Sequence, residues 1–553
     1  MAANELLFLP LGGLGGIGKN CTVLEYEGEI LVIDVGIEFP SEEMFGVDVV
    51  IPDFGYLVEN QERIRGIVVT HGHEDHIGGL PFLLDRISAP VYATPLTRGL
   101  IEVKLNAEQL RRAQLQTILA GQTARMGQFE VTPFHVNHSI PDAVGLAIRT
   151  PAGLVVHTGD FKIDHTPVEG EPADLGQLAR LSAEGVLLLL SDSTNAETPG
   201  YTLSESRLRD TFERVFAHAD GRIIVATFAS LLSRIQMVIE TAAAYGRKVA
   251  VAGRSMEQNT AIAQRLGYLH WPADTQVPLS AVNDLPDEQV VIIATGSQGE
   301  INSALARMAS GRFREVRIRE GDTVLISAKA IPGNETAIHR NVDNLFRRGA
   351  DVVYGPPAGL HVSGHAAQEE LKFILNLLRP VYFVPVHGAY RMLVHHARLA
   401  HELGMPPENV FVLDNGDRLY LSLEGAHLGE PIPAEGVMVD GDTVGDVGPS
   451  ILRDRLTLAQ DGVVVAKVAV DGRTGKVARQ PEIVAHGFVY LPEAAELIDA
   501  ANAEVVQVVE AYQGGSQGYD ANQMSLIVER RLGSFFRSQT GRNPVIVAVV
   551  SVV

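Results

Sequence analysis

Four side chains that commonly bind transition metals lie within six residues of one another, at His71, His73, Asp75 and His76 in the segment "HGHEDH". Residues two apart share one side of an extended segment, so His71 and His73 can point at one ion. Asp75 and His76 fall on the glycine-rich turn that follows and can point at a second ion. Imidazole nitrogen with carboxylate oxygen suits Zn²⁺ or Mn²⁺ and makes a poor calcium site. A solvated polar turn is the alternative, and it does not account for four such side chains together.

Further candidate ligands follow apolar, β-rich runs elsewhere in the chain. They are His138 in "FHVNH", Asp160 in "VVHTGD", Asp192 in "LLLLSDS" and His387 in "YFVPVH". Strand ends are where a rigid scaffold meets solvent, and sites gather there. Taken alone, each of these residues is equally well explained as core or surface polarity. Together with the histidine-rich segment, they complete the ligands for two metal ions.

Charge and cysteine content restrict the class of protein. The chain has 553 residues and a net charge of −22, which argues against nonspecific coating of nucleic acid. A narrow basic channel remains compatible with that charge, and bound divalent cations add positive charge that the count omits. The single cysteine, Cys21, allows no intramolecular disulfide and fits a reducing compartment.

The apolar runs are too short for a membrane helix, which needs about 18 or more such residues. The start "MAANELLFLPLGG" has no basic residue ahead of its short apolar run, so we expect no signal peptide. The expectation is a soluble cytoplasmic protein that does not bind membranes.

The order of the expected elements indicates three regions. The first two hundred or so residues alternate short β-rich runs with turns, and 96–105 is the clearest helix. From Tyr201 onward helices and strands alternate, beginning with a helix over 203–219 that opens on Ser204, and this unit ends near 349–359. Such alternation is typical of a parallel sheet. After a Gly- and Asp-rich stretch, a third region has strands at 462–471 and 482–490, helices at 493–513 and 522–539, and a closing valine-rich strand at 544–553. That last strand is either buried, the favoured reading, or part of an oligomer interface.

The stretch "GLGGIG" at 13–18 satisfies the G-x-G-x-x-G pattern of dinucleotide-binding sites. That site needs a helix next, whose N-terminus holds the pyrophosphate. The residues that follow, "NCTVLEYEGEILVID", predict strand–turn–strand instead. We therefore expect no nucleotide cofactor and attribute the glycines to close backbone approach near the metal site.

The segment "THGHEDHIGG", with His138, Asp160 and His387 downstream, resembles the metallo-β-lactamase superfamily of dinuclear hydrolases. The resemblance implies that two divalent ions, Zn²⁺ or Mn²⁺, are held by His71, His73 and His138 on one side and by Asp75, His76 and His387 on the other, with Asp160 as the bridge and Asp34 orienting ligands from behind. Two ions about 4 Å apart acidify a water between them and neutralise charge in a phosphoryl transition state.

The helix–strand unit between Tyr201 and about Gly359 resembles the β-CASP insertion, which marks nucleic-acid-cleaving members of the superfamily. Asp192 in "SDST", His361 in "HVSGHA" and His387 in "PVHGAY" look like the three motifs of that subgroup. "ATFASLLSR", "TGSQGE", "AIPGNE", "VDGDTVGDVG" and the tail extend the likeness over nearly the whole chain, which resembles the ribonuclease J family.

That resemblance implies an α/β fold, a metallo-β-lactamase αββα sandwich interrupted by a β-CASP α/β domain and followed by a small α+β domain. The expected division is 1–203 and 359–446 for the sandwich, 204–358 for the insertion, 447–463 for a linker, and 464–553 for a C-terminal domain that forms oligomers.

It also implies a metal-dependent ribonuclease that removes nucleotides 5′→3′ from 5′-monophosphorylated single-stranded RNA, cuts internally as well, and acts in RNA maturation and mRNA decay. The expected catalytic residues are Asp75, Asp192 and His361, with His361 as proton donor to the departing 3′ oxygen under the influence of Asp192. The RNA phosphate would be held by Ser230, Ser233, His361, Ser363 and His365. An ordinary helix-capping turn is the alternative for "HVSGHA", with Ser363 as the cap.

The expected partners are RNA, a second copy of the chain (a tetramer is the alternative), and components of an RNA-degrading complex. Asp440 and Asp442 could bind a structural cation, although a simple Asp/Gly turn is favoured. Competing functions are a DNA-processing or purely endonucleolytic enzyme of the same architecture, a non-catalytic scaffold, and a small-molecule hydrolase such as a lactonase. The scaffold predicts substituted metal ligands, and the lactonase needs neither the insertion nor "HVSGHA".

Overall fold

The computed structural model describes residues 4–41, 43–168, 170–331, 334–441, 443–489, 494–512 and 520–553. The chain forms two compact units, one made of residues 1–39 and 49–437 and the other of residues 40–48 and 438–553. Each unit has its own core, and the first carries every candidate ligand of the two expected metal positions.

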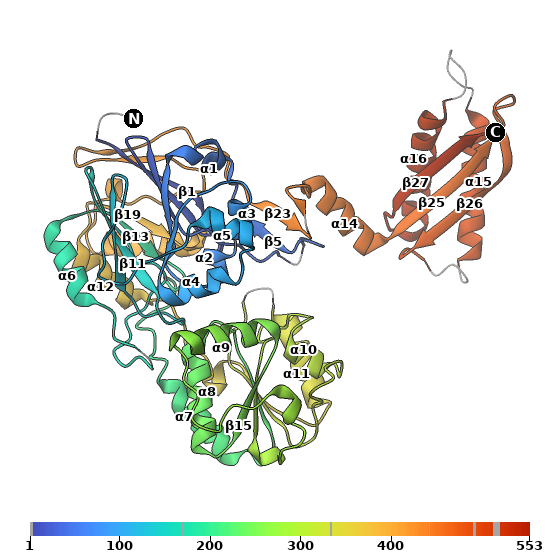
Figure 1. Ribbon diagram of the computed structural model, residues 1–553. Coiled ribbons are helices and arrows are strands. Elements are labelled where there is room, and N and C mark those ends of the chain that lie inside the picture. The colour runs from blue at the N-terminus through green and yellow to red at the C-terminus, as the bar shows by residue number, and fades with distance from the viewer. Residues whose placement is uncertain are drawn as a thin grey trace. The chain divides into compact units, whose positions relative to one another are not determined.

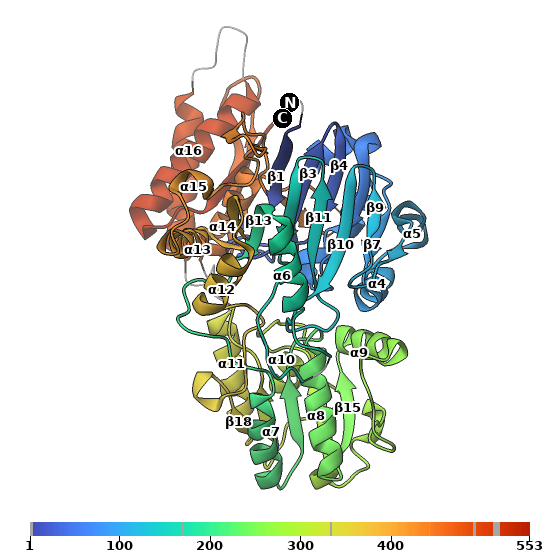
Figure 2. The same cartoon turned by 90° about the vertical axis from the view of Figure 1, so that its left-hand side faces the viewer.

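Two sheets form the centre of the first unit (Figures 1 and 2). The eight-stranded sheet has the order β22 (Ala426–Leu428), β21 (Leu419–Leu421), β1 (Leu6–Gly12), β3 (Cys21–Tyr26), β4 (Glu29–Ile33), β6 (Ile64–Val68), β7 (Val91–Ala93), β8 (Gln116–Thr117). The six-stranded sheet has the order β19 (Tyr382–Val386), β13 (Val186–Asp192), β12 (Gly153–His157), β11 (Val144–Thr150), β10 (Phe129–His135), β9 (Ala124–Met126).

The strand period of two explains how these sheets pack. In β13, Leu188 and Leu190 join a core shared with Phe8 and Leu24 of the other sheet, whereas Leu189 faces the opposite way into a second core. That second core is completed by α6 (Leu175–Glu184), α12 (Gln368–Leu378) and α13 (Tyr390–Glu402). On the other sheet, α4 (Pro95–Glu102) packs against β7 and β8, and α3 (Leu80–Leu84) packs against α5 (Ala107–Ala113). The layers are therefore helix, sheet, sheet, helix.

The insertion is a parallel sheet with the order β15 (Lys248–Ala252), β16 (Val290–Ala294), β14 (Ile223–Ala226), β17 (Thr323–Ile326), β18 (Asp351–Val353). Its helices α7 (Arg207–His218), α8 (Leu232–Ala244), α9 (Arg254–Leu266), α10 (Ala304–Ala309) and α11 (Glu335–Phe346) surround the sheet in Figure 1. The helix expected to open on Ser204 begins at Arg207 instead, and the Ser204 hydroxyl donates to the Thr166 carbonyl and accepts from the Ser206 N–H in the turn before the helix.

In the second unit, β26 (Val477–His486), β25 (Val463–Val470) and β27 (Val545–Val552) form a sheet in that order, preceded by α14 (Pro449–Asp461). Helices α15 (Ala495–Ala511) and α16 (Ala521–Thr540) share one core with the sheet. The closing valine strand is buried on one face only, since Ala548 is 7% exposed but Val547 and Val549 are 41% and 53% exposed. The predicted ends at residues 490, 493 and 513 lie outside the described residues.

The observed layers confirm the predicted α/β class, in which an inserted parallel-sheet domain interrupts a two-sheet sandwich and a small α+β region follows. The residues after "GLGGIG" form strand β3, as expected, and not a helix. Within the described part of the chain, no helix is both long enough and apolar enough to cross a bilayer.

Candidate metal centre and active site

Three imidazole nitrogens converge at what we call position 1. Nδ1 of His73 lies 3.0 Å from Nε2 of His71 and 3.1 Å from Nε2 of His138. His71 follows β6, His73 precedes the one-turn helix α2 (Glu74–Ile77), and His138 follows β10. The structure thus brings the distant His138 to the histidine pair.

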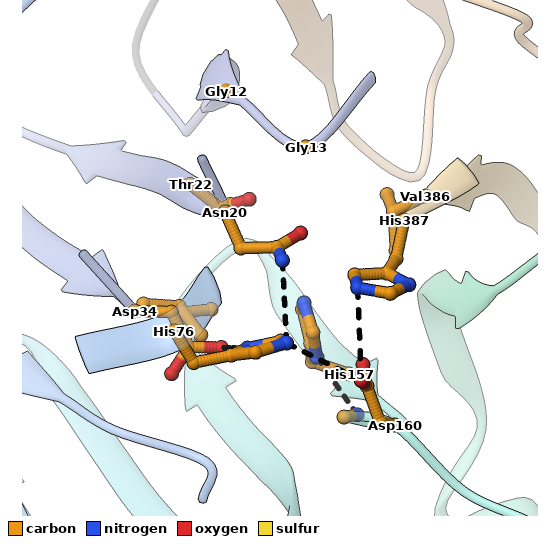
Figure 3. A pocket seen from close by; sticks show the side chains of 12 residues that line it. Gly12, Gly13, Asn20, Thr22, Asp34, His76, His157, Asp160, Val386 and His387 are labelled. Carbon is orange, nitrogen blue, oxygen red and sulfur yellow. Dashed lines mark hydrogen bonds and ion pairs between the residues drawn. The ribbon is translucent and has the colours of Figure 1, made fainter. Parts of the chain in front are cut away.

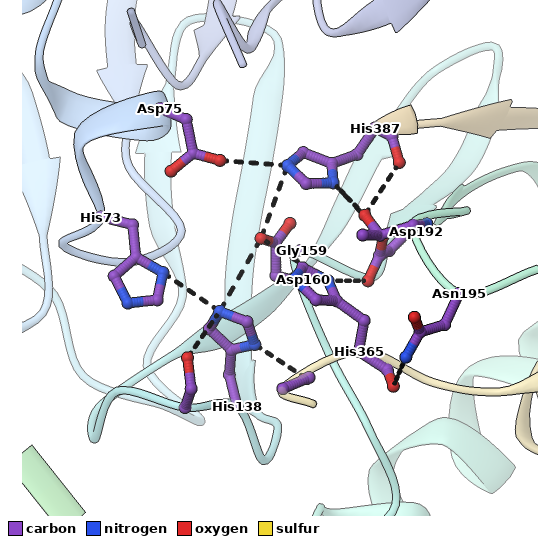
Figure 4. Close-up of polar contacts among 12 residues, drawn as sticks. His73, Asp75, His138, Gly159, Asp160, Asp192, Asn195, His365 and His387 are labelled. Carbon is purple, nitrogen blue, oxygen red and sulfur yellow. Dashed lines mark hydrogen bonds and ion pairs between the residues drawn. The ribbon is translucent and has the colours of Figure 1, made fainter. Parts of the chain in front are cut away.

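Position 2 is formed by two carboxylates and two imidazoles. Nε2 of His387 lies 3.2 Å from Oδ2 of Asp75, and Nε2 of His76 lies 3.3 Å from Oδ2 of Asp160. The same Asp160 oxygen is 3.6 Å from Nε2 of His387. It is also 3.7 Å from Nε2 of His71 in position 1, so Asp160 stands between the two positions, where a bridging ligand belongs (Figure 4).

Asp34 fixes the Nδ1 atoms of two ligand histidines, directly for His76 and through the Thr70 hydroxyl for His71. Nδ1 of His76 donates to Oδ2 of Asp34 over 2.8 Å (Figure 3). The Thr70 hydroxyl donates to the same oxygen over 2.9 Å. Nδ1 of His71 lies 3.1 Å from that hydroxyl and donates to it. Each ring therefore turns its Nε2 inward, and an unprotonated Nε2 in that position can bind a metal.

Two further histidines are fixed in the same way. Nδ1 of His138 donates to the Gly364 carbonyl over 2.8 Å, and Nδ1 of His387 donates to the Thr194 hydroxyl over 2.6 Å. A Cβ on Gly364 would lie 2.7 Å from Nδ1 of His138, which explains the glycine of "HVSGHA". The inward-facing imidazole nitrogens, together with the Asp75 and Asp160 carboxylates, make a donor set that fits divalent transition metals.

Backbone strain also marks this site. Asp34, directly after β4, has φ +60°, and His387, directly after β19, has φ +54°. Non-glycine residues in this region cost free energy, and such residues cluster at functional sites. The backbone N–H of Asp34 donates to the Val68 carbonyl, and the His387 carbonyl accepts from the N–H of Ser193.

Beside position 2 lies a histidine–aspartate pair. Nδ1 of His365 donates to Oδ2 of Asp192 over 2.8 Å, and the His365 ring stacks on that of His387 with centroids 5.5 Å apart. Nδ1 of His365 is also 4.0 Å from Asp160. The partner of Asp192 is therefore His365 and not His361, with which the sequence analysis paired it.

The other expected phosphate ligands lie in two neighbouring segments. Ser363 is in the same loop as His365, and its hydroxyl accepts from Nδ2 of Asn195 over 2.8 Å. Ser230 and Ser233 lie at the start of α8. The next residue, Arg234, donates to the Val362 carbonyl over 3.4 Å, which brings α8 to this loop.

Charge balance in the metal-free protein differs between the two positions. Burial lowers the pKa of His73 to about 4, and it holds the pKa values of His71 and His138 well below the ordinary range. Burial also acts to lower the pKa of His76 and His387, but the carboxylates around them outweigh it and raise both pKa values well above that range. At neutral pH, position 1 is therefore deprotonated, whereas position 2 carries two imidazolium groups.

We expect metal binding to release protons mainly at position 2. A cation must displace the His76 and His387 protons, so affinity there should rise with pH until the pH passes their raised pKa values. At position 1 the affinity should change little above about pH 5, because those imidazoles are already neutral. Calorimetric titration with Zn²⁺ or Mn²⁺ in buffers of different ionisation enthalpy measures the protons released by each ion. Equal release at both positions would contradict this assignment.

Sequence reasoning missed several residues that serve the site. Thr70 and Thr194 adjoin named motifs, so their position in "THGH" and "SDST" was a usable signal. Asn20, whose Nδ2 lies 3.2 Å from Nε2 of His76, has no such signal, and neither has the buried Glu370. The two residues of the possible structural cation site differ in what the structure describes. Asp440 forms an ion pair with Arg455 over 2.5 Å, and Asp442 lies outside the described residues.

Comparison with known families agrees with this architecture. Family models match as follows: "Metallo-beta-lactamase superfamily" at residues 14–195, "Ribonuclease J, beta-CASP domain" at 220–345, "Zn-dependent metallo-hydrolase RNA specificity domain" at 359–413, and "Ribonuclease J C-terminal domain" at 450–553. The fold and the paired ligand groups thus define a metallo-β-lactamase-type hydrolase.

Full-length relatives narrow the family. The chain is 42% identical to Ribonuclease J 1 of Streptococcus pyogenes, with 99% of this chain and 98% of the relative covered. It is 43% identical to Ribonuclease J of Thermus thermophilus, with 98% and 94% covered, and 47% identical to Ribonuclease J of Synechocystis, with 88% and 76% covered. The chain belongs to the ribonuclease J family.

Among solved structures, a protein of unknown function from Enterococcus faecalis superposes with a TM-score of 0.53 at 16% identity. The match covers 75% of this chain and all of that one. At this identity the likeness concerns the fold alone.

Proposed function

We propose that this protein hydrolyses RNA phosphodiester bonds with two divalent ions, Zn²⁺ or Mn²⁺, and removes nucleotides 5′→3′ from 5′-monophosphorylated ends with additional internal cleavage. The observation that carries the proposal is one continuous cluster of three ligand groups, in which positions 1 and 2 adjoin the His365–Asp192 pair. Ions held there supply an acidified water and positive charge for the phosphoryl transition state. The protein's own residues orient the RNA and move the proton.

Charges around His361 support a phosphate pocket. Burial lowers the pKa of His361 to about 3, and the positive charges of Arg234 and Lys329 act in the same direction. Within the described residues its Nδ1 has no hydrogen-bond partner. A neutral imidazole beside the positive charges of Arg234 and Lys329 provides a favourable environment for an incoming phosphate.

The proton donor to the departing 3′ oxygen is better assigned to His365 than to His361. Burial acts to lower the pKa of His365, but the Asp192 carboxylate outweighs it and raises that pKa. The Asp192 carboxylate therefore favours the protonated form of His365, whereas His361, with its pKa near 3, is neutral at neutral pH. We retain Asp192 as the residue that tunes the donor, and Asp75 as a ligand of position 2.

We expect Ser363→Ala to weaken handling of the 5′ phosphate by about tenfold in KM while leaving kcat within about twofold. The Ser363 hydroxyl accepts from Asn195 and from the His365 N–H, which leaves its own proton free to donate to a phosphate. The measurement is steady-state kinetics on 5′-monophosphorylated RNA, with Ser310→Ala on the surface of the insertion as the control. Unchanged KM and unchanged processivity would remove Ser363 from the pocket.

The function is tested with end-labelled RNA and each metal. Stepwise loss of nucleotides from 5′-monophosphate RNA, slower loss from 5′-triphosphate RNA, and inactivity on matched DNA are the expected results. Internal fragments alone would favour a purely endonucleolytic enzyme, and cleavage of DNA would favour a DNA-processing one. Inactivity with every metal would favour a non-catalytic scaffold.

We further propose a cytoplasmic homodimer, with a tetramer as the alternative, that associates with other RNA-degrading components. The proposal also includes the division of the chain into sandwich, insertion, linker and C-terminal domain, with boundaries after residues 203, 358, 446 and 463. The exposed Val547 and Val549 face of the second unit supports an interface there, since edge strands with apolar faces tend to be covered.

A further inference from the structure

One buried carboxylate ties three segments of the first unit together. Glu370, in the first turn of α12, is 0% exposed. Its Oε1 accepts from the Ile163 N–H over 2.8 Å, and its Oε2 accepts from the N–H groups of Thr202 and Ala367 over 2.7 and 2.9 Å. Charge-assisted hydrogen bonds of this kind are stronger than neutral ones.

Each of these three backbone groups lies close in sequence to a part of the active site. Ile163 follows the bridging Asp160 by three residues, and Ala367 follows His365 by two. Thr202 belongs to the connection that leads from Asp192 at the end of β13 into the insertion. A helix cap would require only the bond to Ala367, so the bonds to Ile163 and Thr202 call for another explanation.

The contacts continue from Thr202 to His365. The Thr202 hydroxyl donates to the His365 carbonyl over 2.7 Å, and Nδ2 of Asn195 donates to the same carbonyl over 2.9 Å. The two connections between sandwich and insertion are also joined directly, since the Gln368 N–H donates to the Thr198 carbonyl. Glu370 therefore holds Thr202, and Thr202 holds the backbone of His365.

We propose that Glu370 is a positioning residue that sets His365 against Asp192, and so places the proton donor at the departing 3′ oxygen. This inference rests on the proposed function. In the reaction a water oxygen bonds to phosphorus and releases one proton to solvent, the bond from phosphorus to the 3′ oxygen breaks, and a proton passes from His365 to that oxygen; His365 is then reprotonated from solvent. Displacing the His365 loop impairs proton delivery, and because the Gly364 carbonyl of the same loop orients His138, the metal content of each variant is measured as well.

The test compares two leaving groups in otherwise identical RNA. In Glu370→Gln an NH₂ group replaces one carboxylate oxygen. This group cannot accept hydrogen bonds, so it faces backbone N–H donors without being able to bond to them. We expect turnover of ordinary RNA to fall by about 30-fold, and turnover of RNA with sulfur in place of the first 3′ oxygen to change by less than about threefold, because a thiolate leaves without a proton. Glu369→Gln, at the neighbouring exposed carboxylate, is the matched control and should leave both rates unchanged.

Equal losses on both substrates would mean that Glu370 only stabilises the fold, and unchanged rates would mean that it positions nothing; either result overturns the inference. If Glu370→Gln does not fold, Thr202→Val decides, since it removes the hydroxyl that holds the His365 carbonyl and should show the same dependence on the leaving group. His365→Gln separates the two proposals. If it shows that dependence and the Glu370 and Thr202 variants do not, the proton-donor assignment stands and the role of Glu370 is rejected.

Discussion

Replacing His73 with alanine is expected to lower RNA turnover by at least about 1,000-fold in the presence of either metal. Nδ1 of His73 is the atom on which both other nitrogens of position 1 converge, at 3.0 and 3.1 Å. Without it, two imidazoles and the bridging Asp160 remain near position 1, and the loss of one of its three imidazoles weakens metal binding there. The variant should bind one equivalent less of metal, as measured by elemental analysis after dialysis.

The fold should survive this substitution. His73 precedes α2 but makes no side-chain cap hydrogen bond, and no apolar core includes it. Thermal unfolding of the metal-free variant should match that of the metal-free parent. His135→Ala is a suitable control, because His135 ends β10, three residues before His138, but bonds to the Glu171 carbonyl and not to the cluster. Turnover retained in His73→Ala would reject the paired-metal assignment.

The metal positions were accessible to sequence reasoning because their chemistry is local. Four candidate ligands lie within six residues: His71, His73, Asp75 and His76. They directly follow an apolar run, and side chains placed just after a strand lie at the end of its sheet, where a site can form. Position 1 nevertheless needed the resemblance to bring in His138, since no pattern in a single sequence measures the distance between β6 and β10.

The partner of Asp192 shows the limit of such reasoning. "HVSGHA" contains two histidines four residues apart, and the resemblance pointed to His361 as the one that Asp192 influences. Which of them meets Asp192 depends on how the loop turns, and that is fixed by distant groups, namely Asn195 and Thr202 on the His365 carbonyl and Gly364 against His138. These contacts join residues more than 150 positions apart, beyond the reach of periodicity.

Replacing His365 with glutamine is expected to lower turnover of ordinary RNA by about 100-fold or more. Glutamine can still bond to Asp192 but has no proton to give, so the 3′ oxygen must leave as an alkoxide. The same variant should process RNA with a 3′ sulfur at the first linkage at a rate within about fivefold of the parent, because a thiolate is a far better leaving group. Rates are measured on both substrates under single-turnover conditions, which isolate the chemical step from product release.

Two comparisons make this prediction specific. His361→Gln should slow both substrates alike, through weaker phosphate binding, because a ring with a pKa near 3 donates no proton at neutral pH. Asp192→Asn should follow His365→Gln, since the carboxylate that raises the pKa of His365 is lost. If His361→Gln instead shows the dependence on the leaving group and His365→Gln does not, the donor is His361, and the bond from His365 to Asp192 serves to orient Asp192 beside the metal ligands.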